Sequence, residues 1–541
     1  MEPVWLYDTT LRDGTQGEDI NFTAEEKIRI AMRLDDIGIH YIEGGWPGSN
    51  PRDDAFFDLA SRVRFKKAKL VAFGSTRRQG VRPSADANLN ALVHANTPAV
   101  AMFGKTWDLH VEQVMDNTLA ENLAMIRESV EYVKGKGKEV LYDAEHFFDG
   151  YKGNQEYAQK TIAAALDGGT DSIVLCDTNG GSLPSEITVI VGEIREFIQK
   201  HSKKNGGKPV ILGIHTHNDC SLAVANTLTA VDSGVTMVQG TINGYGERCG
   251  NADLTSIIPV LQLKMNRPCL NDENLARLRE LSRYVSEAAN MTPVSNRPFV
   301  GESAFAHKGG IHVSAIMKCP QAYEHMKPEL VGNRRRVLVS DLSGKSNVAY
   351  KAKELGIDIE SNGTDTAALV SEVKKMENQG YQFDAAEGSF EIWLKKKIGQ
   401  YEPAFELLSF LVTIRKEKNT RCYAEATIKL LVNGEERFTA AEGDGPVGAL
   451  DNALRRALHK FYPEECENMR LVDFKVRVID GREGTAARVK VFIESRDKKE
   501  IWRTIGVSED IIEASWQALA DSFQYRLNKA REELSQPQGK K

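Results

Sequence analysis

The sequence has few cysteines, and none of them stands in a pairing pattern. Seven cysteines are scattered over 541 residues, without a Cys-x-x-Cys spacing. An odd and dispersed set is neither a disulfide framework nor a thiolate zinc site. We therefore expect reduced thiols and a cytoplasmic protein.

Long apolar runs and an excess of positive charge are also missing. No segment offers about 18 unbroken apolar residues, and the amino terminus has no basic stretch that leads into an apolar region. The formal net charge is -6, which gives no reason to expect nucleic acid as a partner. We expect small-molecule partners, no nucleic acid and no membrane.

What the sequence does contain is a repeated pattern. A short apolar run, a polar or glycine-rich turn and an amphipathic segment recur from residue 4 to about 265. Thr23 and Glu26 stand in capping-box spacing before one such segment, and Gly38 closes it. The expected strands are residues 4–8, 40–45, 69–75, 99–105, 139–147, 171–178, 210–217 and 237–244.

Eight strands that alternate with helices over roughly 250 residues predict an α/β fold, the (β/α)8 TIM barrel. A doubly wound open sheet is the alternative, but no GxGxxG follows the first strand. We expect the barrel in residues 1–268, a helical accessory region in 269–400, a carboxy-terminal α+β domain in 401–531 and a disordered tail in 532–541.

The carboxy-terminal domain shows the pattern ββαββα. Asn433 and Gly434 form a hairpin signal within it. The run AAEGDGPVGALDNAL, residues 440–454, places a glycine-rich turn before a helix, which would suit a carboxylate or another anion. An ordinary capped helix is the alternative interpretation.

His215 and His217 stand two residues apart at the end of the seventh expected strand, in GIHTHNDC. Residues i and i+2 of a strand point to the same face, so both imidazoles would project into the barrel mouth. Imidazole nitrogen suits Zn, Mn, Co and Fe. We favour a metal site for this pair; the alternative is that each histidine only satisfies hydrogen bonds.

A divalent ion also needs oxygen ligands, and two strand ends supply candidates. Arg12 and Asp13 lie just beyond the first strand, in DTTLRDG, although Asp-Gly is also a turn signal. Asn243 ends the eighth strand, in NGYGERCGN, and its amide oxygen would complete a set of two nitrogens and two oxygens. Glycines in this loop would let the backbone approach a ligand, though purely steric turns use them too.

Polar residues end the fifth and sixth strands as well. Asp143 and Glu145 would point toward the same opening, with His146 facing the other way, and Thr178 stands at the end of the sixth strand. Active sites of TIM barrels lie where the strands end. We therefore expect Glu145 to have a functional role.

Three of these motifs together resemble the DRE-TIM metallolyase superfamily, the group of 2-isopropylmalate, homocitrate and citramalate synthases. They are DTTLRDG at 8–14, HTHND at 215–219 and NGYGERCGN at 243–251. AFAHKGGIHVSA at 304–315 is similar to the accessory-domain motif of these synthases, and residues 403–530 are similar to their regulatory domain.

Within the group, four further runs are similar to the long-type (R)-citramalate synthases. They are EGGWPGSNP at 43–51, YDAEHFFDGYK at 142–152, LCDTNGG at 175–181 and LVSDLSGKSN at 338–347. The isopropylmalate synthases have a Phe-Pro-Ala run where this chain has WPGS. The resemblance covers nearly the whole chain.

The resemblance implies a ligand set for one divalent ion, which would be Mn, Zn, Mg or Co. The implied ligands are Asp13, His215, His217 and Asn243. It also implies that Arg12 stabilises negative charge on a ketone oxygen and that Thr178 binds the carboxylate of a keto acid.

Further catalytic residues follow from the same resemblance. Glu145 would lie near the reacting carbons. His312 would be the base, with Tyr323 beside it, and both would reach in from a partner subunit. A homodimer is therefore expected.

The implied reaction is a Claisen-type condensation of acetyl-CoA with pyruvate and water, which gives (R)-citramalate and CoA and begins a threonine-independent route to isoleucine. The carboxy-terminal domain would then bind isoleucine as an allosteric inhibitor. Phe73 and Phe103, near the ends of the third and fourth strands, are candidates for limiting the pyruvate pocket, and simple barrel packing is the alternative.

Three other functions are considered. A 2-isopropylmalate synthase would take 2-oxoisovalerate as acceptor by the same mechanism. A metal-dependent hydrolase is expected to carry the HxH pair on its first strand, where this chain has Arg12 and Asp13. A metabolite sensor that keeps the barrel only as a scaffold is expected to have lost a ligand or the arginine, and none is missing.

Overall fold

The computed structural model describes residues 3–204, 209–357, 359, 365–418, 421–479 and 487–535. The chain divides into two compact units. The first is Met1–Phe305 with Met326–Arg334, and the second is Ala306–His325 with Arg335–Lys541. The last residues of the predicted tail, 536–541, lie outside the described residues, whereas α18 continues to Ser535.

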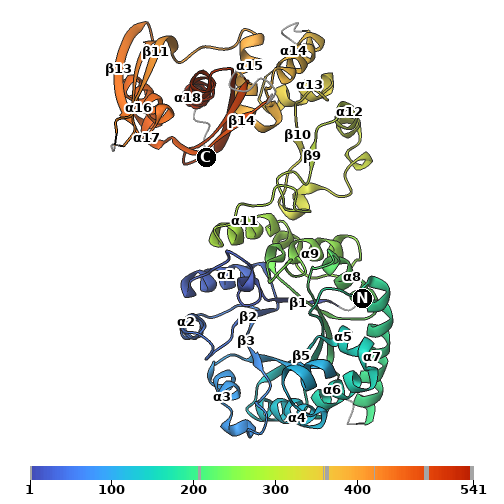
Figure 1. The fold of residues 1–541 in the computed structure, drawn as a ribbon. Coiled ribbons are helices and arrows are strands. Elements are labelled where there is room, and N and C mark those ends of the chain that lie inside the picture. The colour runs from blue at the N-terminus through green and yellow to red at the C-terminus, as the bar shows by residue number, and fades with distance from the viewer. Residues whose placement is uncertain are drawn as a thin grey trace. The chain divides into compact units, whose positions relative to one another are not determined.

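The first unit contains a closed barrel of parallel strands in the order β1 to β8 (Figure 1). This confirms the predicted (β/α)8 fold, with every expected strand present and most of them shorter than expected. The strands are β1 Trp5–Asp8, β2 Tyr41–Gly45, β3 Lys69–Ser75, β4 Ala99–Lys105, β5 Glu139–Glu145, β6 Ser172–Asp177, β7 Ile211–Thr216 and β8 Met237–Gly240.

Helices surround the barrel and continue beyond it within the same unit (Figure 1). The first helix has the predicted capping box between Thr23 and Glu26, and it ends at Gly38 in the left-handed conformation, with φ of 100°. The helices are α1 Ala24–Ile37, α2 Pro51–Ala60, α3 Ala87–His94, α4 Leu119–Gly135, α5 Phe147–Gly153, α6 Gln155–Asp167, α7 Pro184–Lys204, α8 Ala223–Asp232, α9 Leu254–Leu263, α10 Asp272–Leu275 and α11 Leu278–Ala288.

Side chains that alternate along the strands fill the barrel interior. The apolar part of this interior includes Tyr7, Val71, Leu141, Val174 and Met237. Toward the carboxyl ends of the strands the inward positions become polar, with Glu43, Asp143, His215 and Gln239 all buried. The carboxyl ends of the strands, where buried polar groups lie over an apolar packed interior, are where the active sites of such barrels lie.

The second unit begins with helices and short strands. They are β9 Ala306–His307, α12 Gly310–Lys318, β10 Arg336–Val337, α13 Lys345–Glu354, α14 Thr366–Asn378 and α15 Glu387–Lys397. Strands β9 and β10 pair in parallel. The helical character expected for this part of the chain is present.

Two three-stranded antiparallel sheets follow in the second unit, each with a helix against it. The order is βββα twice, with a short extra helix, so the predicted ββαββα pattern lacks one strand in each half. The strand IWRTIGVS, which follows β15 through a charged turn from Asp497 to Glu500, was not predicted. The elements are β11 Glu406–Arg415, β12 Tyr423–Val432, β13 Glu435–Gly443, α16 Pro446–Leu458, α17 Pro463–Asn468, β14 Arg470–Val478, β15 Val489–Arg496, β16 Ile501–Ser508 and α18 Ile511–Ser535.

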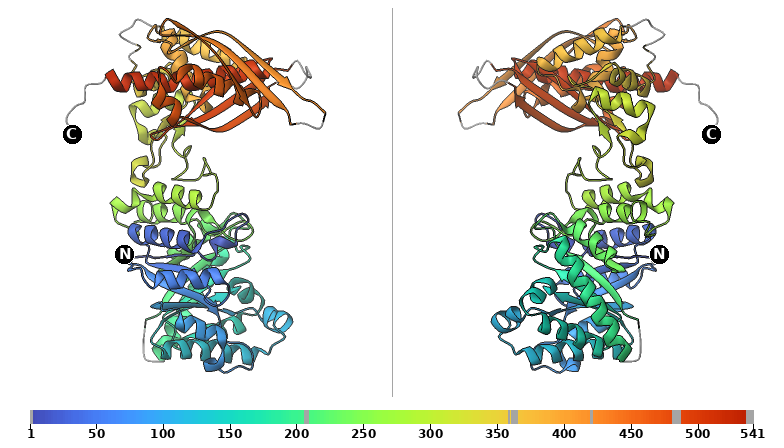
Figure 2. Two further views of the ribbon diagram at one scale, coloured as in Figure 1. Left: turned by 90° about the vertical axis from the view of Figure 1, so that its left-hand side faces the viewer. Right: turned by 90° about the vertical axis from the view of Figure 1, so that its right-hand side faces the viewer.

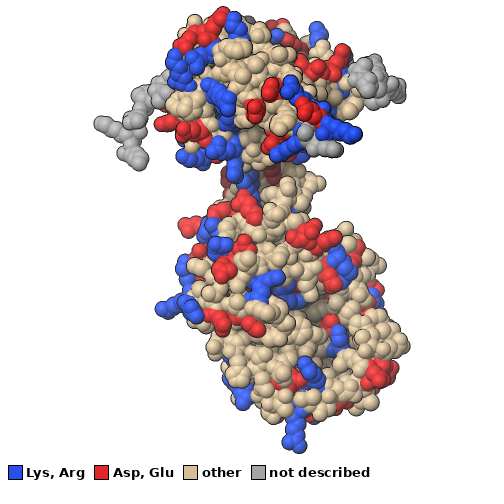
Figure 3. Space-filling view, turned by 60° about the vertical axis from the view of Figure 1, so that its left-hand side comes forward, with Lys and Arg blue, Asp and Glu red and all other residues tan. Residues whose placement is uncertain are grey.

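The predicted hairpin at Asn433 and Gly434 joins β12 to β13. Helix α18 runs along the sheet of β14, β15 and β16 (Figure 2). On the face shown in Figure 3, Lys and Arg side chains alternate with Asp and Glu over both units. Among the described residues, no helix combines the length and the apolar character that a membrane span requires.

Candidate active site

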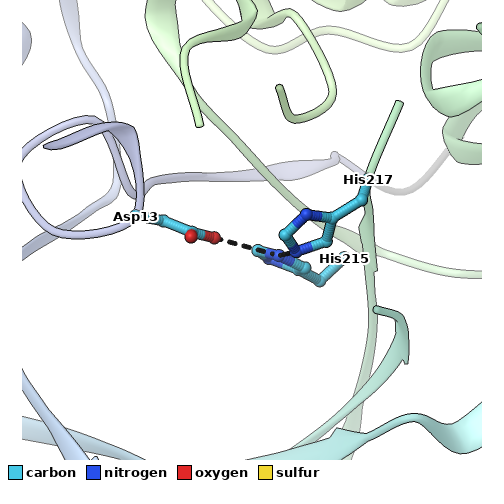
Figure 4. Close-up of side chains that lie close together, drawn as sticks. All are labelled: Asp13, His215 and His217. Carbon is cyan, nitrogen blue, oxygen red and sulfur yellow. Dashed lines mark hydrogen bonds and ion pairs between the residues drawn. The ribbon is translucent and has the colours of Figure 1, made fainter. Parts of the chain in front are cut away.

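The ends of β1 and β7 bring three possible metal ligands together. Oδ2 of Asp13 lies 3.2 Å from Nε2 of His215, and this nitrogen lies 3.2 Å from Nε2 of His217. One ligand atom from each residue falls within 4.8 Å of the others, and all three residues are buried. Figure 4 shows the carboxylate and the rings directed toward one another. The structure thus unites three of the four predicted ligands.

Asn243, the fourth predicted ligand, is not part of this cluster. Its backbone has φ of 66°, and its amide is bound to α11. Nδ2 donates to the carbonyl of Ser282 at 2.9 Å, and Oδ1 accepts from the hydroxyl of Ser282 at 2.6 Å. Both ends of the amide are therefore engaged in holding the helix that follows the barrel.

Asn251 lies where Asn243 was expected. Its Nδ2 is 2.6 Å from Oδ2 of Asp13 and 3.4 Å from Nε2 of His215. A β-bridge between His217 and Asn251 returns the loop after β8 to the end of β7. A Cβ at Gly246 would lie 2.0 Å from Oδ1 of Asn251, so glycine is needed there to leave room for this amide.

The atoms that face one another in the cluster fit a bound cation. Nε2 of His215 lies 3.2 Å from Oδ2 of Asp13 and 3.2 Å from Nε2 of His217, so a carboxylate and two imidazole nitrogens converge in a buried place. Buried polar atoms need partners, and one cation would serve as the partner of all three. A carboxylate, two imidazoles and an amide are a donor set that suits first-row divalent ions.

The pKa shifts of these residues also favour the protonation states that bind a cation. Burial raises the pKa of Asp13, but Arg12 and His215 outweigh it and hold the pKa of this carboxyl well below its usual value. Burial lowers the pKa of His217 to about 4, and His215 adds to the effect. For His215 burial acts against the charged form, yet Asp13 raises its pKa. Near neutral pH, Asp13 is ionised and His217 keeps a free lone pair.

Arg12 is fixed beside this cluster. Its Nε donates to Oε1 of Glu43 at 2.5 Å, and its Nη1 lies 3.4 Å from Oδ1 of Asp13. The hydroxyl of Tyr7 donates to the other oxygen of Glu43 at 2.6 Å. Burial acts to lower the pKa of Arg12, but Glu43 and Asp13 keep it above the usual value. A permanent cation therefore stands next to the ligand cluster.

Phe73 and Phe103 form one wall of the mouth. Their rings stack with centroids 5.5 Å apart, and Trp46 meets each of them edge-on at 5.7 Å. The guanidinium carbon of Arg12 lies 3.7 Å from the ring centre of Phe73. The aromatic wall thus contacts Arg12, which itself lies beside Asp13.

Glu145 and Thr178 lie at the ends of β5 and β6. Oε2 of Glu145 pairs with Nζ of Lys105 at 2.5 Å, and the hydroxyl of Thr178 accepts from the backbone N–H of His146 at 2.9 Å. Arg248 donates to the carbonyl of Thr178 at 2.7 Å. The ends of β4, β5 and β6 are thereby linked to the loop after β8.

His312 and Tyr323 belong to the second unit. Their rings stack with centroids 4.3 Å apart. His312 lies in the first turn of α12 and is exposed, and Tyr323 is 45% exposed. Their predicted proximity to each other is confirmed.

Sequence reasoning missed Glu43, Tyr7, Gln239 and Asn251. An acid inside the apolar run HYIEGG was a usable signal for Glu43, because a buried acid needs a partner. The last asparagine of NGYGERCGN was equally visible, but strand-end position favoured the first.

Three families match consecutive parts of the chain. Residues 3–285 match the HMGL-like family, residues 299–381 the homocitrate synthase post-HMGL domain-like family, and residues 384–527 the LeuA allosteric (dimerisation) domain. The first match spans the barrel with its ligand cluster.

Curated relatives extend over nearly the full length. The chain is 54% identical to the (R)-citramalate synthase of Geobacter sulfurreducens and 52% identical to that of Aquifex aeolicus, covering 98% of this chain and 99% of each relative. The 2-isopropylmalate synthase of Methanocaldococcus jannaschii is more distant, at 29% identity over 97% of this chain and 95% of the relative. The chain therefore belongs to the (R)-citramalate synthase family of HMGL-like enzymes.

Proposed function

We propose that this enzyme, an acyltransferase, condenses acetyl-CoA with pyruvate and water to release (R)-citramalate and CoA. The observation that carries the proposal is the cluster of Asp13, His215 and His217 beside the partly buried Arg12, at the mouth of a barrel of this family. Such a site can hold a 2-oxo acid and neutralise the charge that develops on its ketone oxygen.

We assign Asp13, His215, His217 and Asn251 as the ligands of one divalent ion, with Asn251 in place of Asn243. Turning the amide of Asn251 over would bring Oδ1 to the position of Nδ2, 2.6 Å from Asp13 and free to bind a cation. When bound, the ion would polarise the ketone as a Lewis acid. Mn, Co, Zn and Mg remain the candidates.

Arg12 would stabilise the alkoxide that forms when the ketone is attacked. Its position is fixed by Glu43 and by the ring of Phe73, so it needs no rearrangement during the reaction. A preorganised donor aimed at an oxyanion contributes about 3 kcal/mol of transition-state stabilisation. Arginine suits this role because it stays charged at every working pH.

The methyl proton of acetyl-CoA needs a base, and we assign that role to His312, with Tyr323 against its ring. A positioned base contributes about 10² to 10⁴ in rate. Both residues would come from a partner subunit, in keeping with the LeuA dimerisation match. In the barrel, Glu145 would face the reacting carbons and Thr178 would bind the carboxylate of pyruvate.

Phe73 and Phe103 would limit the pocket to the methyl group of pyruvate. Their stacked rings are braced by Trp46, so a larger 2-oxo acid would have to displace a packed aromatic wall. Exclusion by steric overlap discriminates more strongly than a missing contact does.

The carboxy-terminal domain would bind isoleucine as an inhibitor. It matches the LeuA allosteric domain, and α16 begins at Pro446 directly after β13, as the glycine-rich turn predicted. The free N–H groups of this helix end would receive the carboxylate of an amino acid.

Pyruvate should be the preferred acceptor. With acetyl-CoA fixed, we expect kcat/KM for pyruvate to exceed that for 2-oxoisovalerate by about 100-fold or more, because the aromatic wall excludes the isopropyl group. Release of CoA, followed with a thiol reagent, measures both. A preference for 2-oxoisovalerate would replace the assignment by 2-isopropylmalate synthase.

The two asparagines of the loop after β8 should behave differently. Asn251→Ala should weaken Mn²⁺ binding by about 10-fold or more, because it removes a ligand. Asn243→Ala should retain the affinity and lower the melting temperature, since lost hydrogen bonds to α11 cost about 1–3 kcal/mol of unfolding free energy. Titration of metal-free protein with Mn²⁺ decides between them, and the opposite pattern would restore Asn243 as the ligand.

Isoleucine should inhibit the purified enzyme. We expect it to weaken the binding of a substrate by about fivefold or more, the usual size of allosteric coupling. Initial rates of CoA release, measured with isoleucine and with leucine as the matched control, test this. Equal rates with and without isoleucine in a fully active sample would rule out feedback by this amino acid.

A further inference from the structure

A buried polar pair lies behind the ligand cluster and has no part in the chemistry described so far. Gln239 on β8 is 0% exposed, and Asp143 on β5 is 4% exposed. Nε2 of Gln239 donates to Oδ1 of Asp143 at 3.2 Å, and Oε1 of Gln239 lies 2.9 Å from Nδ1 of His215. Hydrogen bonds thus link Asp143, Gln239 and His215 across the barrel interior.

The donor and acceptor properties of each group determine which way these hydrogen bonds run. An ionised carboxylate only accepts hydrogen bonds, so Asp143 turns the NH₂ of Gln239 toward itself. The amide oxygen that then faces His215 also only accepts, so Nδ1 of His215 carries the proton. Nε2 of the same ring, which lies 3.2 Å from Oδ2 of Asp13, is then the nitrogen that would offer its lone pair to a bound ion.

The other tautomer of His215 would prevent this residue from binding the ion. A proton on Nε2 of His215 would point at Asp13 and His217, and it would remove one ligand from the cluster. His217 has no equivalent support, since its Nδ1 lacks a hydrogen-bond partner among the described residues. Among the described residues, the hydrogen bond between His215 and Gln239 is therefore what orients the histidine pair from behind.

We propose that Gln239 and Asp143 are positioning residues that hold His215 in its metal-binding tautomer and ring orientation. This inference rests on the metal site proposed above. Hydrogen bonds to the far nitrogen of a ligating histidine typically change metal affinity about 10- to 100-fold. Here the acceptor is an amide, whose direction has to be set by a second residue.

A purely structural role gives a different expectation. If Gln239 and Asp143 only satisfied each other inside the barrel, their loss would lower stability and leave the affinity of folded protein for metal unchanged. Met237 provides a matched control, because it lies two residues before Gln239 on β8 and is also buried in the barrel interior.

The test compares Gln239→Leu, Gln239→Glu, Asp143→Asn and the control Met237→Leu in the full-length protein. Mn²⁺ dissociation constants of metal-free samples are measured by electron paramagnetic resonance, and melting temperatures are measured alongside. A mildly alkaline pH keeps Asp143 ionised, because burial raises the pKa of this carboxyl to about 7.

Gln239→Leu should raise the dissociation constant of the folded protein about 10- to 100-fold, whereas Met237→Leu should leave it unchanged. Gln239→Glu should bind more tightly than Gln239→Leu, because it keeps an acceptor for Nδ1. Asp143→Asn should lower the affinity for Mn²⁺ by a smaller factor, because the new amide can still accept from Gln239 but can also donate, so it no longer fixes the orientation of Gln239. This variant tests the proposal if Gln239→Leu fails to fold.

Two results would overturn the proposal in distinguishable ways. Unchanged affinity in Gln239→Leu and Asp143→Asn, with tight binding in the unchanged protein, would leave the pair a structural role only. An unchanged protein that does not bind Mn²⁺ would remove the metal site itself.

Discussion

A buried carboxylate and two imidazole nitrogens meet at one point in the barrel mouth, and the rest of the site depends on that convergence. Asp13 is 2% exposed, and its charge is compensated on one side by Arg12 at 3.4 Å. On its other side lie the nitrogens of His215 and His217. Buried charges require partners, and a divalent cation bound between these groups would supply one.

The barrel makes this arrangement because it gathers residues that are distant in sequence. Asp13 follows β1, the histidines end β7, and Asn251 comes back from the loop after β8 through a β-bridge to His217. Gly246 leaves the space that the amide of Asn251 occupies. The rigid strands thus hold side chains that no single helix or loop could place together.

The sequence predicted the barrel and the convergence of Asp13, His215 and His217, the first from its periodicity and the second from strand-end positions together with the DTTLRDG motif. Apolar runs marked the strands, and the i, i+2 spacing of His215 and His217 fixed their common face. The place of Asn251 beside Asp13 did not follow from spacing, because the turn after β8 adopts a left-handed backbone at Asn243 and directs the amide of Asn243 to α11. Partners such as Glu43 and Gln239 are set by tertiary contacts, which strand patterns do not encode.

The central claim is that these side chains grip one divalent ion. Anomalous diffraction from crystals of the enzyme soaked in Mn²⁺ tests it most directly. We expect a single strong peak per chain within about 2.3 Å of Nε2 of His215 and His217, of a carboxylate oxygen of Asp13 and of the amide oxygen of Asn251. A strong peak elsewhere in the chain, with none at this point, would contradict the account.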